Sequence, residues 1–568
     1  MSVEPDKVLR EVMESIVGAA NPRPGLSDVI NLVCSGSNVI LSAPAGYGKT
    51  IIPYTLGLLC KRGMSYSVST YHILPLRSII DDVWSRLFRN SKPKHKELDN
   101  LSVGRQMMGV SEAPNLQKPF VITTMDTFLM ALLKIPPADL TYIWKGVSLG
   151  HGEYTRALIL YSVTIFDEIQ LMMEESGIHS EVFLEVVKWL THMGSKVVLM
   201  TATLPRQLEH LLTQNLCNVR FIRYGVDFKD PEFEALRLSN TIITEKPLYT
   251  SISEAAREFV KGGQHDRVAL IVNTVKSLVE VSEAVKEYVE PVILHSGLKL
   301  SDRRSRIERV RSSKEYILVS TQVIEAGVDL SFQAMLTEAT TPCSMVQRVG
   351  RLLRHDEGEE GILRIVYDPL FFDKENSRYT VYPAGLVESS IRIIQEILAR
   401  GQEILWHLPI QDGYMGFEKY MERSYLESGY QFYRGRTWES DIVGQTLSNI
   451  IHSPNRILDL LMGSRGILRD GNLVLGVVES ENAESLPEDD LVPLNMARLR
   501  LIYEWCKKKG GVKGLYIDKS GESLKINDAS EDVRNILGGR APSFYLRAII
   551  VPEDLYDETY GITGVIHP

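Results

Sequence analysis

The sequence predicts an α/β protein with two parallel-sheet lobes in tandem and a smaller, mostly helical C-terminal accessory domain. Three observations lead to this prediction. Short apolar runs of strand length alternate with amphipathic helices between about residues 38 and 367, which is typical of βα units in parallel sheets. The first series of units closes near residue 237, and a second series follows it. Beyond residue 372 helical spacing and frequent aromatic residues replace the alternation, so the predicted domains are 1–237, 238–372 and 373–568.

Composition limits the class of protein before any motif is considered. The 568 residues are 44% hydrophobic, which is enough for several domains with their own cores. The net charge of −9 argues against a general nucleic-acid coat, so any nucleic-acid contact should be a local groove. Five scattered cysteines without a CxxC pair argue against a disulfide framework or a zinc cluster. An acidic N-terminus and the lack of an 18-residue apolar run predict a soluble, intracellular protein with no membrane partner.

A glycine-rich loop opens the first lobe. The apolar run 38–42 predicts a buried strand, the segment 43–50 reads Ala-Pro-Ala-Gly-Tyr-Gly-Lys-Thr, and a helix follows despite an early proline. Strand, glycine-rich loop and helix in this order are the phosphate-binding P-loop. The glycines let the backbone approach a phosphate, the lysine reaches the β- and γ-phosphates, and the threonine hydroxyl can bind Mg²⁺. The residues expected to contact the nucleotide here are Ala45, Gly46, Gly48, Lys49 and Thr50.

An acidic pair follows the long apolar run 157–166, which we interpret as a buried strand. In a P-loop protein, Asp167 at this place would hold Mg²⁺ through water and Glu168 would polarise the attacking water. The alternative is a helix N-terminus with acidic residues in its first turn. The P-loop upstream favours the catalytic interpretation.

Several other predicted strands end in hydroxyl or amide side chains. In a parallel sheet these ends share one edge, where they can contact the backbone of a ligand. For each threonine an ordinary helix N-cap is the simpler alternative. The segment 91–118 between two of these strands is polar and reads as irregular. The strand ends in question are Leu74-Pro75-Leu-Arg77, Thr123-Thr124, Thr201-Ala-Thr203, Asn273-Thr274 and Ser320-Thr321.

The second lobe supplies two arginine-rich segments. The basic helix 303–314 reads as a solvated face more readily than as a DNA contact. The segment 347–354, Gln-Arg-Val-Gly-Arg-Leu-Leu-Arg, places arginines three apart, which suits a clamp on a γ-phosphate in a neighbouring lobe. In the C-terminal domain, aromatic residues between 406 and 438 are interleaved with arginines. They predict either core aromatics with rim arginines or a base-stacking surface.

Taken in order, these segments resemble the motif series of a superfamily 2 helicase over roughly residues 30–360. The wording of TTMDTF, TQVIEAGVD and QRVGRLLR is similar to the CRISPR-associated helicase of type I interference systems. The resemblance implies two RecA-like lobes, ATP and Mg²⁺ as cofactors, and an ATPase that moves along single-stranded DNA. It also implies a CRISPR RNA-guided surveillance complex as partner. The full series is APAGYGKT, LPLRS, TTMD, DEIQ, TATLP, the strand ending at Asn273, STQVIEAGVD and QRVGRLLR.

That family usually carries a metal-dependent HD nuclease ahead of the helicase. The P-loop here begins at residue 43, and the two His-Asp pairs, 265–266 and 355–356, lie within the helicase core. We therefore expect a separate HD nuclease subunit. Two rivals remain: another superfamily 2 enzyme acting in DNA repair or on RNA, and an ATP-gated clamp that loads a nuclease without translocating.

The resemblance also assigns roles to residues. Gln170 stands where the family has a histidine, and the segment 22–27 lacks the glutamine that reads adenine. The residues expected at the nucleotide from the second lobe are Gly327, Asp329, Gln347, Arg351 and Arg354, with Arg351 as the arginine finger. Those expected to couple hydrolysis to movement are Gln170, Thr201 and Thr203. Those expected along the DNA backbone are Pro75, Arg77, Thr124, Asn273 and Thr321.

Overall fold

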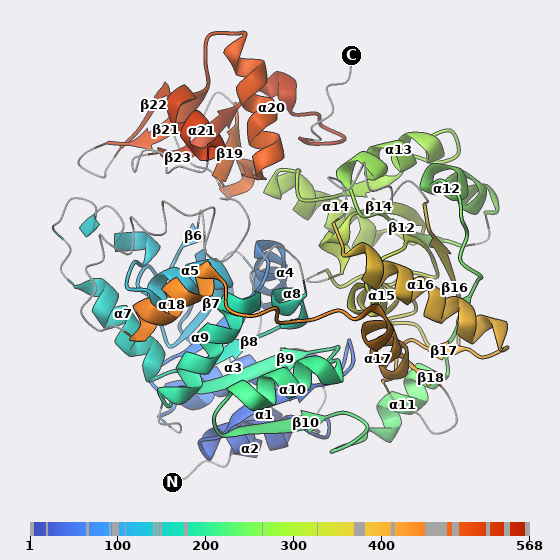
Figure 1. The fold of residues 1–568 in the computed structure, drawn as a ribbon, viewed down its shortest axis with the longest axis horizontal. Helices are drawn as coiled ribbons and strands as arrows, with labels where there is room; N and C mark the ends of the chain where they lie inside the picture. The colour runs from blue at the N-terminus through green and yellow to red at the C-terminus, as the bar shows by residue number, and fades with distance from the viewer. Residues whose placement is uncertain are drawn as a thin grey trace.

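A computed structural model of the protein shows two α/β lobes side by side, with a third sheet stacked on them (Figure 1). Gly327, one of the expected nucleotide residues, lies outside the described residues. The structure describes residues 5–18, 21–63, 67–89, 92–93, 101–107, 110–139, 142–143, 147, 150–174, 180–263, 265–325, 328–368, 381–409, 415–448, 474–479, 488–518, 523–538 and 546–562.

The first lobe is built on an eight-stranded sheet with the order β10-β1-β9-β8-β2-β7-β5-β6. All neighbours pair in parallel except β5 and β6. The strands are β1 Asn38–Ser42, β2 Thr70–Leu74, β5 Val103–Met107, β6 Val110–Ser111, β7 Phe120–Thr124, β8 Val163–Phe166, β9 Lys196–Thr201 and β10 Val219–Arg223, with a separate hairpin of β3 Phe88–Arg89 and β4 Lys92–Pro93.

Helices cover both faces of this sheet. Successive side chains of a strand point to opposite faces, and both sets are buried here. Val39 and Leu41 of β1 pack with α1 to α4, whereas Ile40 between them packs with the helices of the opposite face. The helices are α1 Pro5–Val17, α2 Leu26–Cys34, α3 Ile51–Lys61, α4 Arg77–Leu87, α5 Met125–Leu132, α7 His151–Leu160, α8 Gln170–Met173, α9 Ser180–His192, α10 Arg206–Asn215 and α11 Pro231–Leu238, with a 3₁₀ turn η2 Pro137–Asp139.

Two expectations for this lobe were wrong. The apolar run 157–166 is not one strand, because α7 continues to Leu160 and only Val163–Phe166 is extended. A continuous apolar run does not distinguish a buried helix end from a buried strand, and here it contains both. The stretch 91–118, expected to be irregular, contributes β5 and β6 to the edge of the sheet.

The second lobe has a six-stranded, fully parallel sheet with the order β11-β16-β15-β12-β14-β13. Its strands are β11 Thr241–Thr244, β12 Arg267–Ile271, β13 Val292–Leu294, β14 Tyr316–Ser320, β15 Ala334–Glu338 and β16 Glu360–Val366. Its helices are α12 Ile252–Lys261, α13 Val275–Val285, α14 Leu300–Ser312 and α15 Pro342–Val349, with a 3₁₀ turn η3 Gln322–Ile324. The last element before this sheet is α11, so the change of lobe falls at that helix.

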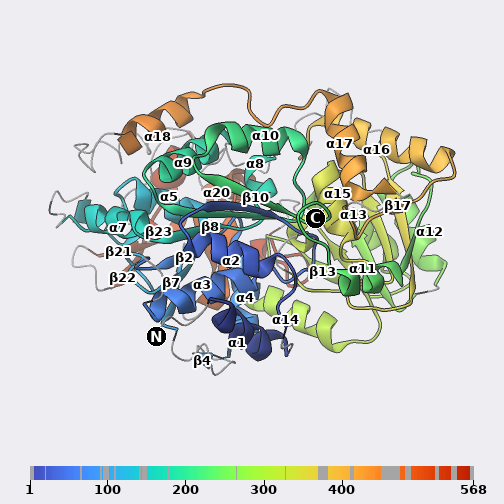
Figure 2. The same ribbon diagram turned by 90° about the horizontal axis from the view of Figure 1, so that it is seen from below.

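The helices at the start of the C-terminal region pack on both lobes and do not form a separate compact domain. Helix α16 packs on α17 and both contact α15 of the second lobe, whereas α18 packs on α9 of the first lobe (Figure 2). The chain from α17 to α18 therefore crosses between the lobes. These elements are α16 Ala384–Ala399, β17 Ile404–Leu405, β18 Met415–Gly416, α17 Phe417–Ser428 and α18 Trp438–Ser448.

A five-stranded mixed sheet completes the chain, in the order β20-β19-β23-β21-β22. Of its strands, only β23 was expected from the sequence, because the preceding segments lack a clear alternation of apolar and polar residues. Its elements are β19 Val474–Val478, η6 Glu488–Asp490, β20 Leu491–Leu494, α20 Met496–Lys507, β21 Lys513–Ile517, β22 Leu524–Asp528, α21 Ser530–Leu537, β23 Leu546–Val551 and η7 Glu553–Leu555.

The last described residues of the chain pack against the basic helix α14. Arg306 donates to the backbone carbonyls of Thr559 and Glu558, and the Ile562 amide donates to the Gly297 carbonyl at 3.0 Å. Arg304 pairs with Asp489 at 2.8 Å. Arg304 and Arg306 thus bind other parts of the protein, whereas Arg309 and Arg311 are exposed to solvent.

The aromatic residues of the C-terminal region are mainly core residues. Trp406, Tyr420 and Tyr425 are at most 2% exposed, and Arg423 pairs with Glu396 at 2.7 Å. This favours core aromatics with rim arginines over a stacking surface for bases. No helix within the described part of the chain is long and apolar enough to cross a bilayer.

Candidate nucleotide-binding site between the lobes

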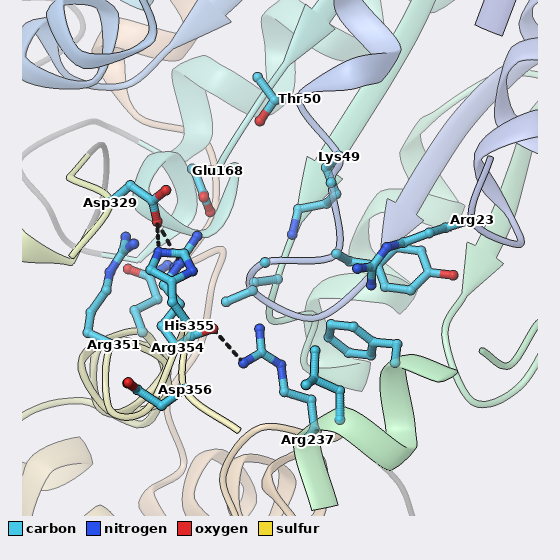
Figure 3. Close-up of a pocket in the computed structure, with 18 of the residues that line it drawn as sticks. Arg23, Lys49, Thr50, Glu168, Arg237, Asp329, Arg351, Arg354, His355 and Asp356 are labelled. Carbon is cyan, nitrogen blue, oxygen red and sulfur yellow. Dashed lines mark hydrogen bonds and ion pairs between the residues drawn. The ribbon is translucent and has the colours of Figure 1, made fainter. Parts of the chain in front are cut away.

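A cleft of about 470 Å³ lies where the P-loop faces the second lobe (Figure 3). The first lobe supplies its P-loop and the acidic pair after β8, and α11 closes one end. The second lobe supplies its arginine-rich segment from the end of α15 onward. The lining residues on which the chemistry depends are Lys49, Thr50, Asp167, Glu168, Asp329, Gln347, Arg351 and Arg354.

The P-loop has the backbone that a phosphate cradle needs. Gly46 and Gly48 have φ angles of 79° and 95°, in the left-handed region that favours glycine. The Lys49 ammonium donates to the carbonyls of Ala43 and Pro44 at 2.7 and 3.2 Å, so it lies on its own loop. Burial lowers the pKa of Lys49, against the opposing pull of Glu168 and Asp167. Phosphate oxygens would replace these carbonyls as its partners when a nucleotide binds.

Thr50 and Asp167 fit a magnesium ion. Thr50 precedes α3, and its hydroxyl makes no capping hydrogen bond to that helix. Asp167 follows β8, where its Oδ2 lies 3.2 Å from Nε2 of the fully buried His72. Mg²⁺ is usually held by one or two carboxylates together with phosphate and water oxygens, so a denser protein cluster is not required.

Glu168 has an unusual backbone. Its φ angle is 53°, which few residues other than glycine adopt, and its amide donates to Asp167 Oδ1 at 3.0 Å. Such strain costs about 1–3 kcal/mol and persists where the surroundings fix the conformation, often in an active site. Here the left-handed turn presents Glu168 to the cleft directly after the strand.

Gln170 links the acidic pair to the strand end at Thr201. The Gln170 amide donates to Glu168 Oε2 at 2.6 Å, and the Thr201 hydroxyl lies 2.5 Å from the Gln170 carbonyl oxygen. The Thr203 amide in turn donates to the Thr201 hydroxyl at 3.0 Å. These three residues were expected to act in coupling, and the structure brings them into one buried hydrogen-bonded chain that begins at Glu168. An amide, with one donor and one acceptor end, can occupy the place of the family's histidine.

Replacing Gln170 by alanine should separate hydrolysis from movement. The variant loses a hydrogen bond to the Glu168 carboxylate, which contributes about 1.5–3 kcal/mol, and a neutral one with Thr201, which contributes about 0.5–1.5 kcal/mol. We expect the amount of strand displaced per ATP hydrolysed to fall about tenfold or more, while the protein still hydrolyses ATP. The measurement is ATP turnover and strand displacement on the same substrate. An unchanged ratio of the two would contradict a coupling role.

The second lobe presents Arg351 and Gln347 to the P-loop. Arg351 is 7% exposed, and its Nη2 donates to the Glu325 carbonyl at 2.8 Å. Gln347 is 6% exposed, and both its amide atoms are buried without a hydrogen-bond partner. The positive charges of Arg354 and Arg351 both act on the Lys49 ammonium across the cleft. The sequence-predicted groups from the two lobes therefore face one another.

Arg354 and Asp329 form a pair within the second lobe. Arg354 Nε lies 2.8 Å from Asp329 Oδ1, and His355 Nε2 lies 3.1 Å from the same oxygen (Figure 3). Asp329 thus orients Arg354 along the cleft in this structure. Asp356, which follows His355 in the sequence, forms an ion pair with Arg267 at 2.6 Å. Within the described ranges no group of three or more His, Cys, Asp and Glu residues could hold a metal ion.

Arg348, which the helical spacing grouped with Arg351, does not reach the cleft. It is fully buried and donates to Glu325 Oε1 at 2.7 Å, Thr337 Oγ1 at 2.8 Å and Asn273 Oδ1 at 2.8 Å. Helix α15 ends at Val349, so Arg348 and Arg351 do not share a helical face. Arg348 is therefore a core residue of the second lobe and was not among the arginines expected at the γ-phosphate.

The residues expected along a nucleic-acid backbone follow strands of both lobes, at the carboxyl edge. Asn273 is an exception in its contacts: it is 2% exposed, and its amide donates to the Ala339 carbonyl at 2.8 Å while its oxygen accepts from Arg348. Asn273 thus positions Arg348 in this structure, and its contact with a nucleic-acid strand stays a prediction. Thr124 is the N-cap of α5, accepting from the Thr127 amide. Pro75, Arg77 and Thr321 lie at the ends of β2 and β14, and their contact with a strand stays a prediction.

Sequence reasoning missed several lining residues, among them a group at one end of the cleft: Arg23, Phe233, Leu236 and Arg237. Arg23 lies in the segment before α2 that lacks the adenine-reading glutamine, and the other three lie on α11. Arg237 Nη1 donates to the Arg354 carbonyl at 2.9 Å (Figure 3). No local sequence signal identified these residues. They meet at the cleft only because α11 lies where the chain passes from the first lobe to the second.

Comparison with known proteins agrees with this geometry. Residues 23–211 match the DEAD/DEAH box helicase family, and residues 264–357 match the family described as CRISPR-associated nuclease/helicase Cas3, C-terminal. The chain resembles the helicase region of Cas3. The two matched segments are similar to helicase domains, as the motif series indicated.

Individual Cas3 proteins show the extent of the likeness. The CRISPR-associated nuclease/helicase Cas3 of Methanothermobacter thermautotrophicus is 24% identical over 485 residues, covering 79% of this chain and 51% of the relative. The CRISPR-associated helicase Cas3 of Thermoproteus tenax is 22% identical, covering 73% of this chain and 69% of the relative. The crystal structure of T. fusca Cas3 with AMPPNP aligns with a TM-score of 0.61 at 16% identity, covering 97% of this chain and 71% of that one. The chain thus spans about half the length of the first relative.

Proposed function

We propose that the protein is an ATP-dependent single-stranded DNA translocase that unwinds target DNA in CRISPR type I interference. In this proposal it supplies the unwound strand to a separate HD nuclease subunit and is recruited by a CRISPR RNA-guided surveillance complex in the prokaryotic cytoplasm. The observation that carries the proposal is the shared cleft, because Lys49 and Glu168 of one lobe face Arg351 and Arg354 of the other. A ligand held by both sides draws the lobes together, and its hydrolysis releases them.

ATP and Mg²⁺ are the proposed cofactors. The P-loop amides and Lys49 would hold the phosphates, and Thr50 and Asp167 would hold Mg²⁺, which neutralises charge on the phosphate oxygens. Glu168 would orient and polarise the attacking water. Gln347, Arg351 and Arg354 would stabilise negative charge that develops on the γ-phosphate from the second lobe.

Movement of the lobes would be passed to DNA at the carboxyl edges of the two sheets. The chain Glu168–Gln170–Thr201 joins the hydrolytic carboxylate to a strand end at that edge. Separation of a DNA base-pair step costs ~1.4 kcal/mol, so steady unwinding requires such coupling to hydrolysis. The names of the Cas3 relatives support the interference role, and the nuclease and surveillance-complex partners are part of the proposal.

The test is ATP hydrolysis by the purified chain with single-stranded DNA, duplex DNA and RNA compared at one salt concentration. We expect strong stimulation by single-stranded DNA, and loss of that activity in Lys49→Ala because the phosphates lose their cationic partner. Lys276→Ala is a matched control, since Lys276 lies on the exposed surface of α13, 70% exposed. Stimulation by RNA alone would overturn the DNA role and favour an RNA helicase. Hydrolysis without displacement of a strand would favour an ATP-gated clamp.

A further inference from the structure

Two arginines at the α11 end of the cleft have no acidic partner among the described residues. Arg237 is 7% exposed, and its hydrogen bond goes to the carbonyl of Arg354. Its Nε is buried without a partner, and so is Nη1 of Arg23. Burial, together with the positive charges of Arg354 and Arg23, lowers the pKa of Arg237 to about 10. Buried cations are normally paired, so this end of the cleft has groups that a ligand would satisfy.

The carboxylates that line the cleft do not meet this need. Glu325 is engaged by Arg348, Asp329 by Arg354 and Asp356 by Arg267. Glu357 is exposed to solvent. The missing partner of Arg23 and Arg237 is therefore expected from the bound molecule.

Aromatic packing holds both guanidinium groups around one ring. The Arg23 guanidinium lies 4.9 Å from the centre of the Phe233 ring, and that of Arg237 lies 5.0 Å from it. Phe233 is fixed in turn by Tyr47, whose ring centre is 5.2 Å away and whose hydroxyl donates to the Pro24 carbonyl at 2.8 Å. The result is a rigid set of planar groups beside the P-loop. Gly46 lies directly beside it, since an added Cβ there would be 2.6 Å from Arg237 Nη2.

We propose that the guanidinium planes of Arg23 and Arg237, which the buried ring of Phe233 holds in place, form a stacking site for the base of the bound nucleotide, and that this site accepts any nucleobase with similar affinity. This inference rests on the proposed nucleotide-binding function and specifies what the site recognises. The phosphate groups belong at the P-loop, whereas this end of the cleft combines guanidinium planes with the apolar side chains of Phe233 and Leu236. Arginine planes and aromatic rings stack on every base, because every base has a π-face.

Arg23, Phe233 and Arg237 have no side-chain group that accepts from the amino group of adenine. A site that hydrogen-bonds a particular substrate group can reject an analogue lacking it by 10⁴–10⁵-fold. The guanidinium groups are donors only, and each common base carries acceptors. The segment before α2 has Arg23 and no glutamine to accept from the amino group of adenine. We therefore expect ATP and GTP to differ by less than about tenfold in affinity and in kcat/KM.

The test is competition against a fluorescent ADP analogue on the full chain, with ADP, GDP, CDP and inorganic tripolyphosphate as competitors. Loss of stacking on one plane should weaken a base about 5- to 150-fold. Arg237→Gln and Phe233→Leu should thus weaken all three nucleotides about tenfold and leave tripolyphosphate unchanged. Arg257→Gln on the exposed face of α12 is the matched control. A melting curve without nucleotide identifies a variant that fails to fold, and Arg23→Gln then replaces Phe233→Leu.

Arg237→Lys separates stacking from charge. A stacking role predicts that lysine does not restore nucleotide affinity, because it lacks the planar group. Equal weakening of nucleotides and tripolyphosphate, rescued by lysine, would show a phosphate contact and overturn the inference, as would a wild-type preference for ADP above 100-fold. The binding assay needs neither DNA nor hydrolysis. Base-tolerant binding without stimulation by DNA would therefore overturn the proposed function alone, and a DNA-stimulated but strictly ATP-specific chain would overturn this inference alone.

Discussion

Arg351→Ala is expected to lower nucleic-acid-stimulated ATP turnover by about 10³-fold or more, the range observed when an arginine finger is removed. Arg351 reaches the cleft from the second lobe, where its charge acts on Lys49, and the Glu325 carbonyl holds its guanidinium at 2.8 Å. Its charge would meet the γ-phosphate only when the lobes close on a nucleotide, so the loss should appear in kcat more than in KM. The measurement is steady-state turnover with saturating single-stranded DNA.

Arg348→Ala provides a sharp contrast three positions earlier. Arg348 is fully buried, and its removal would leave Glu325 as an uncompensated carboxylate. Breaking a buried pair in this way costs about 3–5 kcal/mol. We therefore expect Arg348→Ala to lower the melting temperature and Arg351→Ala to leave it nearly unchanged. Near-normal turnover in a folded Arg351→Ala protein would exclude the arginine-finger assignment.

The second large effect is expected from Glu168→Gln, which should lower ATP turnover about 10²- to 10⁴-fold, the usual contribution of a general base. The substitution preserves the shape of the side chain at its left-handed backbone position, with a φ angle of 53°. It also removes the negative charge that polarises water and that accepts from the Gln170 amide. Binding of ADP should remain within a few-fold of the wild type.

Turnover and nucleotide affinity should be measured on the same preparation. Glu258→Gln is a matched control, because Glu258 is exposed on α12 away from the cleft. If Glu168→Gln lost nucleotide binding as well as turnover, the residue would be part of the binding surface, and another group would have to activate the water. Retained binding with lost turnover would assign the chemistry to Glu168.

Much of the nucleotide site could be predicted because its signals are local. Three motifs require particular residue types at fixed spacing: the P-loop, the acidic pair and the arginine-rich segment. Each of them follows a strand or helix with a recognisable hydrophobic pattern. Parallel strands place their carboxyl ends at one edge, so the meeting of these groups followed from the fold class. The same reasoning failed for the run 157–166, because hydrophobicity without a period does not separate the end of α7 from β8.

Burial decided the roles of residues that the sequence treated alike. Arg348 and Arg351 belong to one motif, yet α15 ends between them, so one is a core residue and the other faces the cleft. Asn273 was expected along a nucleic-acid strand, and only the structure shows that its side chain also bonds to Arg348 and Ala339 within the second lobe. The arginines of α14 were weighed as solvent or DNA contacts, whereas Arg306 among them binds backbone carbonyls near the end of the chain.

The sequence by itself determined the two-lobed α/β class, the P-loop, the acidic pair and the arginine-rich segment, because short-range periodicity and motif spacing are written along the chain. Only the tertiary structure decided which of these groups meet across the lobes, and that Arg23, Phe233 and Arg237 enclose one end of the cleft. Arg23 and Arg237 are 214 positions apart and come together through the return of β10 beside β1 and the change of lobe at α11. Contacts of this kind depend on packing between distant elements, for which one sequence carries no local signal.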